Sequence, residues 1–315
     1  MKKEIKEMLE KQQYRLVGEH SASKACEYVK KSIRDEDVCY KQTFYGIQSH
    51  RCVQMTPTVN HCPNECIFCW RAMDKEYNEG VEIKNESSPE DIIKGCIEQQ
   101  LDMIVGFKGN EKINKQKFEE AQEPLHFAIS LSGEHTLYPR LKEMIQLLDN
   151  KKMTSFVVTN GMYPERLEGL EPTQLYVSVF APDKELYKGI SKSSFDDSWE
   201  RLMKTLEALN KLRDKGVRTC LRITLINDLN MVKPEKYAEL IKKANPMFVE
   251  VQSYMWVGFS QLRLEKKNMP LHEEAKEFAE RIAEHCDYDI IDEKRESRVV
   301  LLMKKEDLKD RFLKL

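Results

Sequence analysis

Short apolar runs alternate with longer amphipathic stretches over most of this 315-residue chain. Six of the runs have the length and composition of buried strands, and they cover residues 50–57, 126–131, 154–161, 175–182, 217–228 and 247–258. The stretches between them carry helix signals, such as Ser88 followed by Pro89 and two acidic residues. Strands that alternate with helices form βαβ units around a parallel sheet. The pattern therefore predicts an α/β fold, an incomplete (βα)6 barrel of the TIM type.

The two ends of the chain have other patterns. Residues 1–45 favour two helices, over about 2–13 and 22–32, and a connecting segment. The C-terminal end favours a helix around 271–286, two strands near 287–303 and a basic terminal helix. We therefore expect three parts: an N-terminal helical segment over residues 1–48, the partial barrel over residues 49–260 and a C-terminal extension over residues 261–315.

Charge and hydropathy argue against a globally basic protein and against a membrane-spanning one. The chain has 51 Lys and Arg against 53 Asp and Glu, so its net charge of −2 attracts it neither to nucleic acid nor to an anionic membrane. A site for a polyanion must then be a local patch. No apolar run approaches the roughly 18 residues of a membrane span, and the N-terminus lacks the apolar segment of a signal peptide. We expect a soluble, cytoplasmic protein without a membrane partner.

The nine cysteines are unevenly distributed. Six of them lie between positions 26 and 69, namely Cys26, Cys39, Cys52, Cys62, Cys66 and Cys69. Disulfides are rare in the reducing cytosol, so this clustering indicates metal, redox or cluster chemistry. The other three, Cys96, Cys220 and Cys286, fall inside apolar patterns, and we expect them to be ordinary buried residues.

Cys62, Cys66 and Cys69 follow the first predicted barrel strand, with three and then two residues between them. A structural zinc site takes four protein ligands, usually as two pairs, and the second pair is absent here. A [4Fe–4S] cluster bound by three thiolates instead leaves one iron open to another ligand. The spacing favours such a cluster, with zinc or unconnected thiols as the alternative.

Further polar residues stand where the other predicted strands end. Parallel barrels carry their catalytic groups at the C-terminal ends of the strands. This rule selects Ser132, Gly133 and Glu134 after the second strand, Thr159 and Asn160 after the third, Ser178 in the fourth, and Arg222 and Thr224 in the fifth. Each of them is alternatively a strand-end residue that caps a neighbouring helix.

Cys26, Cys39 and Cys52 are separated by twelve residues each time, which is not the spacing of a zinc finger. Brought together beside the barrel, they are able to hold a second cluster with an open iron. Lys41, two residues after Cys39, would then lie close to that cluster. A lysine in such an environment can form an imine with a carbonyl substrate; otherwise it is a surface residue.

The cysteine spacing resembles the motif of the radical S-adenosylmethionine (SAM) superfamily, and longer strings resemble the 4-demethylwyosine synthases, which are tRNA-modifying members of it. Besides the upstream cysteines, the strings are MTPTVNHCPNECIFCWR (55–71), LSGEHTLYPRL (131–141), FVVTNGMYPERL (156–167), LYVSVFAPD (175–183) and VEVQSYMWVGFSQLRL (249–264). The resemblance covers nearly the whole chain.

This resemblance implies two [4Fe–4S] clusters, one binding SAM and one auxiliary. SAM would lie on the open iron of the first cluster, with the polar strand-end residues around it. The implied enzyme, a lyase, converts 1-methylguanosine next to the anticodon of tRNA(Phe) to 4-demethylwyosine, with pyruvate as the two-carbon donor. We expect pyruvate to be held either on the auxiliary cluster, which we favour, or as an imine with a lysine, for which Lys41 is the first candidate and Lys152 the second.

The resemblance also implies partners. The chain resembles the shorter archaeal form without a flavodoxin-like domain, so we expect an external electron donor of the flavodoxin or ferredoxin type, and a monomer. For tRNA contacts we select basic clusters at Lys2, Lys3 and Lys6, at Lys294, Arg295 and Arg298, and at Lys304, Lys305, Lys309, Arg311 and Lys314. Tyr254, Trp256 and Phe259 are expected either to stack on the target base or to pack in the core. Two alternatives are a radical SAM enzyme with another substrate and a non-catalytic zinc or tRNA-binding module.

Overall fold

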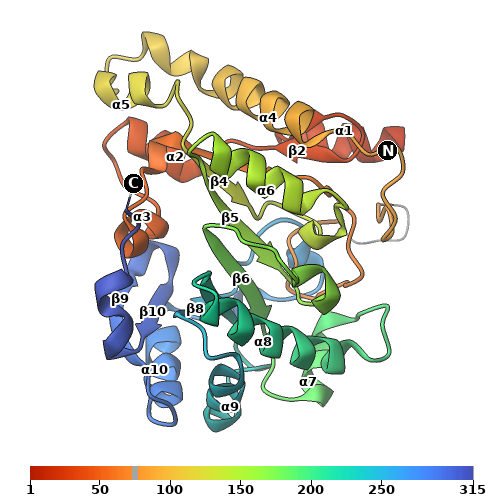
Figure 1. Cartoon of the computed structure of the whole chain (residues 1–315), viewed down its shortest axis with the longest axis vertical. Coiled ribbons are helices and arrows are strands. Elements are labelled where there is room, and N and C mark those ends of the chain that lie inside the picture. The colour runs from red at the N-terminus through yellow and green to blue at the C-terminus, as the bar shows by residue number, and fades with distance from the viewer. Residues whose placement is uncertain (73–76, 315) are drawn as a thin grey trace.

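One sheet of ten strands runs through the computed structural model, which describes residues 1–72 and 77–314 (Figure 1). Its strand order is β1-β2-β3-β4-β5-β6-β7-β8-β10-β9. The strands are β1 (Arg15–Val17), β2 (Ser21–Ser23), β3 (Cys52–Thr56), β4 (His126–Ile129), β5 (Thr154–Thr159), β6 (Gln174–Val179), β7 (Arg218–Leu225), β8 (Phe248–Ser253), β9 (Asp289–Lys294) and β10 (Val299–Met303).

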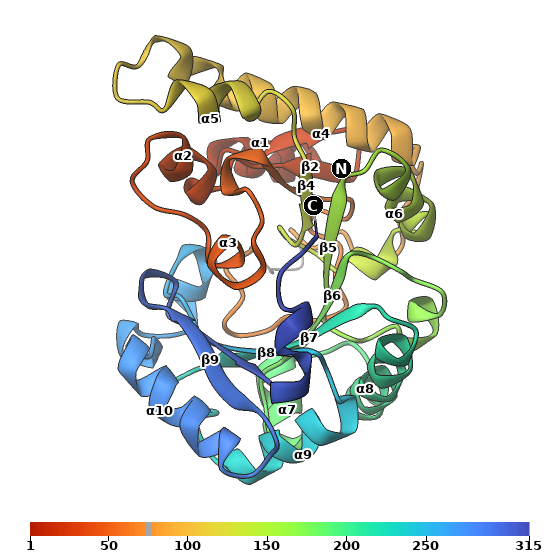
Figure 2. The ribbon, with the colours of Figure 1, turned by 60° about the vertical axis from the view of Figure 1, so that its left-hand side comes forward.

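The six strands β3 to β8 are parallel, and each is hydrogen-bonded to the next. They are the six strands that the apolar runs predict. Helices surround the outer face of the curved sheet (Figure 2): α4 (Pro89–Ile104), α6 (Leu141–Asn150), α7 (Lys184–Ser191), α8 (Ser198–Asp214), α9 (Pro234–Ala244) and α10 (His272–Ala283). The strands β1 and β9 end the sheet without pairing to each other. The predicted incomplete barrel is confirmed.

Alternate residues of the strands belong to two different cores, as the period of two along a strand requires. Outward residues such as Val157, Val177 and Ile223 pack in the core that contains the helices. Inward residues such as Phe156 and Tyr176 belong to a second core. This inner core includes aromatic residues of the short helix α3 (Tyr40–Tyr45). The N-terminal segment therefore fills the barrel near the N-terminal ends of its strands.

The N-terminal segment differs from its prediction. The first helix is confirmed as α1 (Lys3–Lys11), but the expected helix over 22–32 begins only at α2 (Glu27–Ile33). Before it, β1 and β2 form a hairpin that pairs with β3 and extends the sheet. Gly18, with φ of +63°, forms the turn of this hairpin. Segments of three residues are too short for their alternation to be recognised in a sequence.

The C-terminal extension adds an antiparallel pair to the other side of the barrel. The two strands predicted near 287–303 are β9 and β10, and β10 pairs with β8. The predicted terminal helix is a 3-10 turn over Lys305–Asp310 instead. The following residues cross below the barrel, where the Leu313 amide donates to the Tyr45 carbonyl at 2.9 Å. Because one sheet runs through all three predicted parts, their boundaries stay a prediction.

Local signals explain where two of the helices begin. In α4, the Ser88 hydroxyl accepts a hydrogen bond from the Asp91 amide at 3.1 Å, and Pro89 occupies the first helical position, as predicted. The polar segment expected to be loop contains the short helix α5 (Lys115–Glu120), capped by Asn114. No helix within residues 1–72 and 77–314 is long and apolar enough to cross a membrane.

Candidate active site

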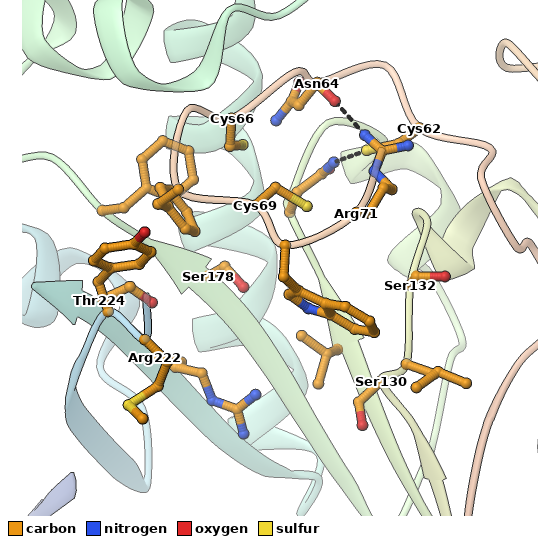
Figure 3. Close-up of a pocket in the computed structure, with 18 of the residues that line it drawn as sticks. Cys62, Asn64, Cys66, Cys69, Arg71, Ser130, Ser132, Ser178, Arg222 and Thr224 are labelled. Atoms are coloured by element: carbon orange, nitrogen blue, oxygen red, sulfur yellow. Dashed lines mark hydrogen bonds between the residues drawn. The ribbon is translucent and has the colours of Figure 1, made fainter. Parts of the chain in front are cut away.

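A cavity of about 340 Å³ lies at the C-terminal ends of the parallel strands (Figure 3). The loop after β3 brings Cys62, Cys66 and Cys69 into it. All the polar residues that the strand-end rule selects also line it: Ser132, Gly133, Glu134, Thr159, Asn160, Ser178, Arg222 and Thr224. The structure therefore gathers residues from four other strands around three thiols. Their contacts to a ligand stay a prediction.

Contacts from distant parts of the chain hold the cysteine loop. The Ile67 amide donates to the Ile190 carbonyl at 3.0 Å, which ties the loop to α7. On its other side, the Arg263 guanidinium donates to the carbonyl oxygens of Ile67, at 3.1 Å, and of Cys69. Between these two attachments the Cys69 amide donates to the Cys66 carbonyl at 2.9 Å, which forms a tight turn. The loop is thus anchored at Ile67 and Cys69, within the triad itself.

The thiols of this triad need a positive partner to lose their protons. Burial raises the pKa of Cys62 to about 11, and it raises the pKa of Cys66 as well. The guanidinium of Arg71, which is 3 % exposed, lies beside all three cysteines and lowers the pKa of Cys62 and Cys66. Its Nη2 donates to the Asn64 carbonyl at 2.6 Å. A buried guanidinium next to three thiols suits a site that carries negative charge.

The donor set also fits an iron–sulfur cluster. Among the residues that the structure describes, no three His, Cys, Asp or Glu side chains are arranged around a single metal ion, as a structural zinc would require. Three soft sulfur donors on one loop fit a cluster with one open iron. Asn160 supplies a hydrogen bond to this group, because its Nδ2 donates to the Cys62 sulfur at 3.5 Å.

Glu134 joins the ends of two strands. Its Oε1 accepts from the Thr136 amide at 3.1 Å and from the hydroxyls of Thr136 and Thr159 at 2.6 Å each. Its Oε2 accepts from the Asn160 amide at 2.7 Å. Only Oε2 retains capacity for a ligand. Gly133 is required beside it, because a Cβ there would lie 1.9 Å from the Thr58 carbonyl oxygen.

The upstream cysteines Cys26, Cys39 and Cys52 line a second cavity, of about 220 Å³, deeper in the barrel. Cys26 and Cys39 precede the first turns of α2 and α3, and Cys52 begins β3. Burial raises the pKa of Cys39 and of Cys52 to about 12, which the nearby charge of Lys41 opposes. The structure brings together the three thiols that the sequence analysis proposed as a second triad.

Lys41 lies in this second cavity, and Lys152 does not. The Lys41 side chain is 6 % exposed, and its Nζ lies 4.9 Å from the Phe156 ring centre and 5.1 Å from that of Tyr176. Burial lowers the pKa of Lys41, and the charge of Arg222 lowers it further. Lys152 is exposed in the turn before β5, at the opposite end of that strand, and it lines neither cavity.

A buried ion pair, which the sequence analysis did not select as a pair, lies between the two cavities. The Nε of Arg222 donates to Glu250 at 2.9 Å, and its Nη2 donates to the Tyr40 hydroxyl at 2.8 Å. Glu250 is fully buried and also accepts from the Tyr45 hydroxyl at 2.7 Å. The signal for Glu250 was a lone charge inside the apolar strand MFVEVQSY. Arg71 and Arg263 gave no such signal, because only tertiary contacts place them.

The aromatic residues after β8 mostly pack into the protein. Tyr254 is 2 % exposed, with its hydroxyl bonded to Ser260 at 2.8 Å, and the Trp256 indole donates to the Leu264 carbonyl at 2.9 Å. Core packing thus explains both. The residues between and beside them, Met255 and Val257, line the cavity and are about half exposed.

Two family models match the chain. The model of the radical SAM superfamily matches residues 56–241, and the model of wyosine base formation matches residues 243–304. The "S-adenosyl-L-methionine-dependent tRNA 4-demethylwyosine synthase" of Pyrococcus abyssi is 48% identical, over 96% of this chain and 90% of the relative. The protein of the same name from Methanocaldococcus jannaschii is 40% identical, over 95% of each chain.

A solved structure agrees with these relatives. The structure described as "TYW1 with a lysine-pyruvate adduct bound" superposes with a TM-score of 0.87 at 37% sequence identity, over 99% of this chain and 98% of the other. The radical SAM assignment and the fold expected from the sequence are both confirmed.

Proposed function

Because the chain belongs to the family of S-adenosyl-L-methionine-dependent tRNA 4-demethylwyosine synthases, we propose that it converts 1-methylguanosine next to the anticodon of tRNA(Phe) to 4-demethylwyosine. We further propose that pyruvate donates the two added carbons. One observation carries this proposal: a single barrel contains two cysteine-lined cavities, and a buried lysine lies in the second. Membership of an enzyme family removes the alternative of a non-catalytic zinc or tRNA-binding module.

The first cavity is the proposed site of SAM cleavage. Cys62, Cys66 and Cys69 would hold a [4Fe–4S] cluster, which supplies, with SAM, the radical chemistry that names the superfamily. The side chains of this chain then bind and orient SAM. The main chain at Gly133 packs closely on Thr58, just before the cysteine loop, and Oε2 of Glu134 is the carboxylate oxygen open to an ammonium group.

The second cavity is the proposed site of pyruvate. Cys26, Cys39 and Cys52 would hold an auxiliary [4Fe–4S] cluster beside it. The lysine–pyruvate adduct of the structural relative and the burial of Lys41 together favour an imine over chelation, contrary to the expectation from sequence. In that step the amine of Lys41 attacks the ketone carbon of pyruvate, and the carbonyl oxygen leaves as water.

The base must enter through the mouth of the first cavity. Met255, Val257 and Trp70 line it there, and we propose that they receive the unstacked purine. The electron would come from an external flavodoxin or ferredoxin, and the protein would act as a monomer.

A basic groove beside this mouth is the proposed path of the tRNA backbone. It contains Lys6, Arg15, Lys24 and Lys30, and the Lys24 ammonium lies 5.8 Å from the Trp70 ring. In this groove Arg15 and Lys30 pair with acids only at 4.0 and 3.8 Å, with Asp102 and Glu27. Four basic residues of the C-terminal extension pair with acids at shorter distances: Lys294 with Asp37, Lys304 with Asp287, Lys305 with Asp289 and Arg311 with Asp292. The groove is therefore a better candidate for phosphate contacts than these clusters.

An anaerobic assay tests the proposed function. Reconstituted protein, SAM, dithionite and pyruvate are incubated with tRNA(Phe) that carries 1-methylguanosine, and the nucleosides are identified by mass spectrometry. We expect the tricyclic nucleoside with this tRNA and not with tRNA that carries unmethylated guanosine. Failure to form it from the methylated tRNA, while SAM is still cleaved, would point to another substrate.

A further inference from the structure

One residue, Arg222, lines both cavities. We propose that its guanidinium binds the carboxylate of the 2-oxo acid while the ketone faces Lys41. This inference rests on the proposed function, and it assigns a carboxylate site that selects charged 2-oxo acids over neutral ketones. It also moves Arg222 from the SAM contacts, where the sequence analysis placed it, to the second substrate.

The guanidinium is held in a fixed orientation. Arg222 lies in β7 beside Glu250 in β8, with which it is in register. The bonds from Nε to Glu250 and from Nη2 to Tyr40 fix two of its three nitrogens. The guanidinium group also lies over the Tyr176 ring, with the Arg222 Cζ atom 4.4 Å from the ring centre. An arginine held in this way is preorganised for a planar carboxylate.

The third nitrogen is the one available to a ligand. Within the described part of the chain, Nη1 of Arg222 makes no hydrogen bond to another residue. Arg222 is not completely enclosed, because its side chain is 12% exposed, whereas Glu250 is at 0%. Nη1 is therefore a hydrogen-bond donor of a mostly buried guanidinium, on a residue that lines both cavities.

Lys41 and Arg222 share one aromatic neighbour. The Lys41 ammonium lies 5.1 Å from the centre of the Tyr176 ring, on which Arg222 also packs. Glu250 is the buried carboxylate that accepts from Arg222. A 2-oxo acid has its carboxylate next to its ketone, so it offers one group to the guanidinium and the other to the amine that line the second cavity.

The position of Arg222 favours this anion over the carboxylate of SAM. Its guanidinium lies at the end of the first cavity away from Cys62, Cys66 and Cys69, with Ser178 between (Figure 3). Ser130 lies at the same end and also lines both cavities. The partner Tyr40 belongs to the second cavity. Arg222 therefore borders the first cavity but donates to Tyr40, a residue of the second.

Equilibrium dialysis of labelled pyruvate tests the proposal. The anaerobically reconstituted protein is compared with Arg222→Lys, which keeps the charge beside Glu250 but loses the planar fork. The double variant Arg222→Met/Glu250→Gln avoids leaving Glu250 buried without a partner. Arg281→Met, an exposed arginine of α10, is the matched control. Unlabelled methyl pyruvate, which has the same ketone but no charge, competes in parallel, and SAM affinity is measured for each protein.

We expect both Arg222 variants to bind pyruvate about tenfold or more weakly, the effect of losing a charge-assisted hydrogen bond. Their preference for pyruvate over methyl pyruvate should disappear, while SAM affinity stays within about twofold and Arg281→Met behaves as the wild type. Unchanged pyruvate affinity in both variants would overturn the role of Arg222 and leave the proposed function intact. A loss of SAM affinity alone would return Arg222 to the SAM site. If the wild type binds no pyruvate, the proposed two-carbon donor is wrong together with this inference.

Discussion

Arg263 donates a hydrogen bond to the carbonyl oxygen of Ile67 at 3.1 Å, although 196 positions separate the two residues in the sequence. The same guanidinium reaches the Cys69 carbonyl. The segment after β8, close to the start of the wyosine family model, thus holds the cysteine loop of the radical SAM part. Two functional regions of the chain are coupled through one side chain.

Replacing Arg263 should therefore loosen the first cluster. Each lost charge-assisted hydrogen bond costs about 1.5–3 kcal/mol, so Arg263→Ala should lose iron from the first site faster during dialysis than the wild type. Arg263→Lys should be intermediate, and Arg281→Ala is the control. Electron paramagnetic resonance of the reduced protein follows each cluster. Identical iron retention in Arg263→Ala and the control would mean that the loop does not depend on Arg263.

Each upstream cysteine should be needed for exactly one of the two clusters. Cys26→Ala, Cys39→Ala and Cys52→Ala should each reduce the iron content from about eight to about four per chain, because each cluster holds four irons. Cleavage of SAM should continue, and ring formation should stop. Cys286→Ala, outside both cavities, should keep the full iron content. Ring formation by Cys39→Ala would contradict the role of the second triad.

Lys41 should be the lysine that forms an adduct with pyruvate. Incubation with pyruvate and cyanoborohydride, followed by intact-protein mass spectrometry, should give one reduced adduct on the wild type and on Lys152→Ala. Lys41→Ala should give none, because Lys152 is exposed and outside the cavity. Peptide mapping locates the modified residue. An adduct on Lys152, or retained adduct on Lys41→Ala, would reverse this assignment.

Glu134→Gln should weaken both the protein and its SAM site. The amide introduces a donor where the carboxylate accepts four hydrogen bonds from the chain. A buried donor or acceptor left unpaired costs about 1–3 kcal/mol, so the free energy of unfolding in urea should fall by about that amount. Glu277→Gln, an exposed residue of α10, is the control. If both variants unfold at the same urea concentration, the bonds of Glu134 do not contribute to stability.

The basic groove should contribute to tRNA affinity through phosphates. Lys24→Ala should weaken tRNA binding and reduce the slope of log affinity against log salt by roughly 0.7–0.9, the value for one lost phosphate contact. Lys305→Ala removes a charge that is paired with Asp289 and should change the slope less. Filter binding at several salt concentrations measures both quantities. The reverse order of effects would place the tRNA on the C-terminal extension.

Much of this architecture was predictable from the sequence. The six barrel strands are continuous apolar runs, which is typical of strands buried on both faces, and the Ser88–Pro89 pair marked the start of α4. The hairpin of β1 and β2 was missed because its strands have only three residues each. Helix α3 was missed because its aromatic residues are buried by the barrel interior rather than by their own periodicity.

The parts of the candidate site that depend on the local spacing of residues were predictable from the sequence. Cys62, Cys66 and Cys69 and the strand-end residues follow from such rules, and they share one cavity. Arg71, Arg263 and the bond between Arg222 and Tyr40 depend on which side chains meet in space. Lys152 was a candidate by residue type alone, since it precedes the predicted strand 154–161 and so lies at the end opposite to the one that the strand-end rule selects.

Labelled pyruvate tests the central claim, that two cavities of one barrel join SAM chemistry to a 2-oxo acid. The anaerobic reaction is run once with pyruvate labelled with ¹³C at C2 and C3, and once with pyruvate labelled at C1. The masses of the tRNA nucleosides are then measured by mass spectrometry. The account predicts a tricyclic nucleoside that is heavier by both labelled carbons in the first reaction and unlabelled in the second. A tricyclic product without label from C2 and C3 would contradict it.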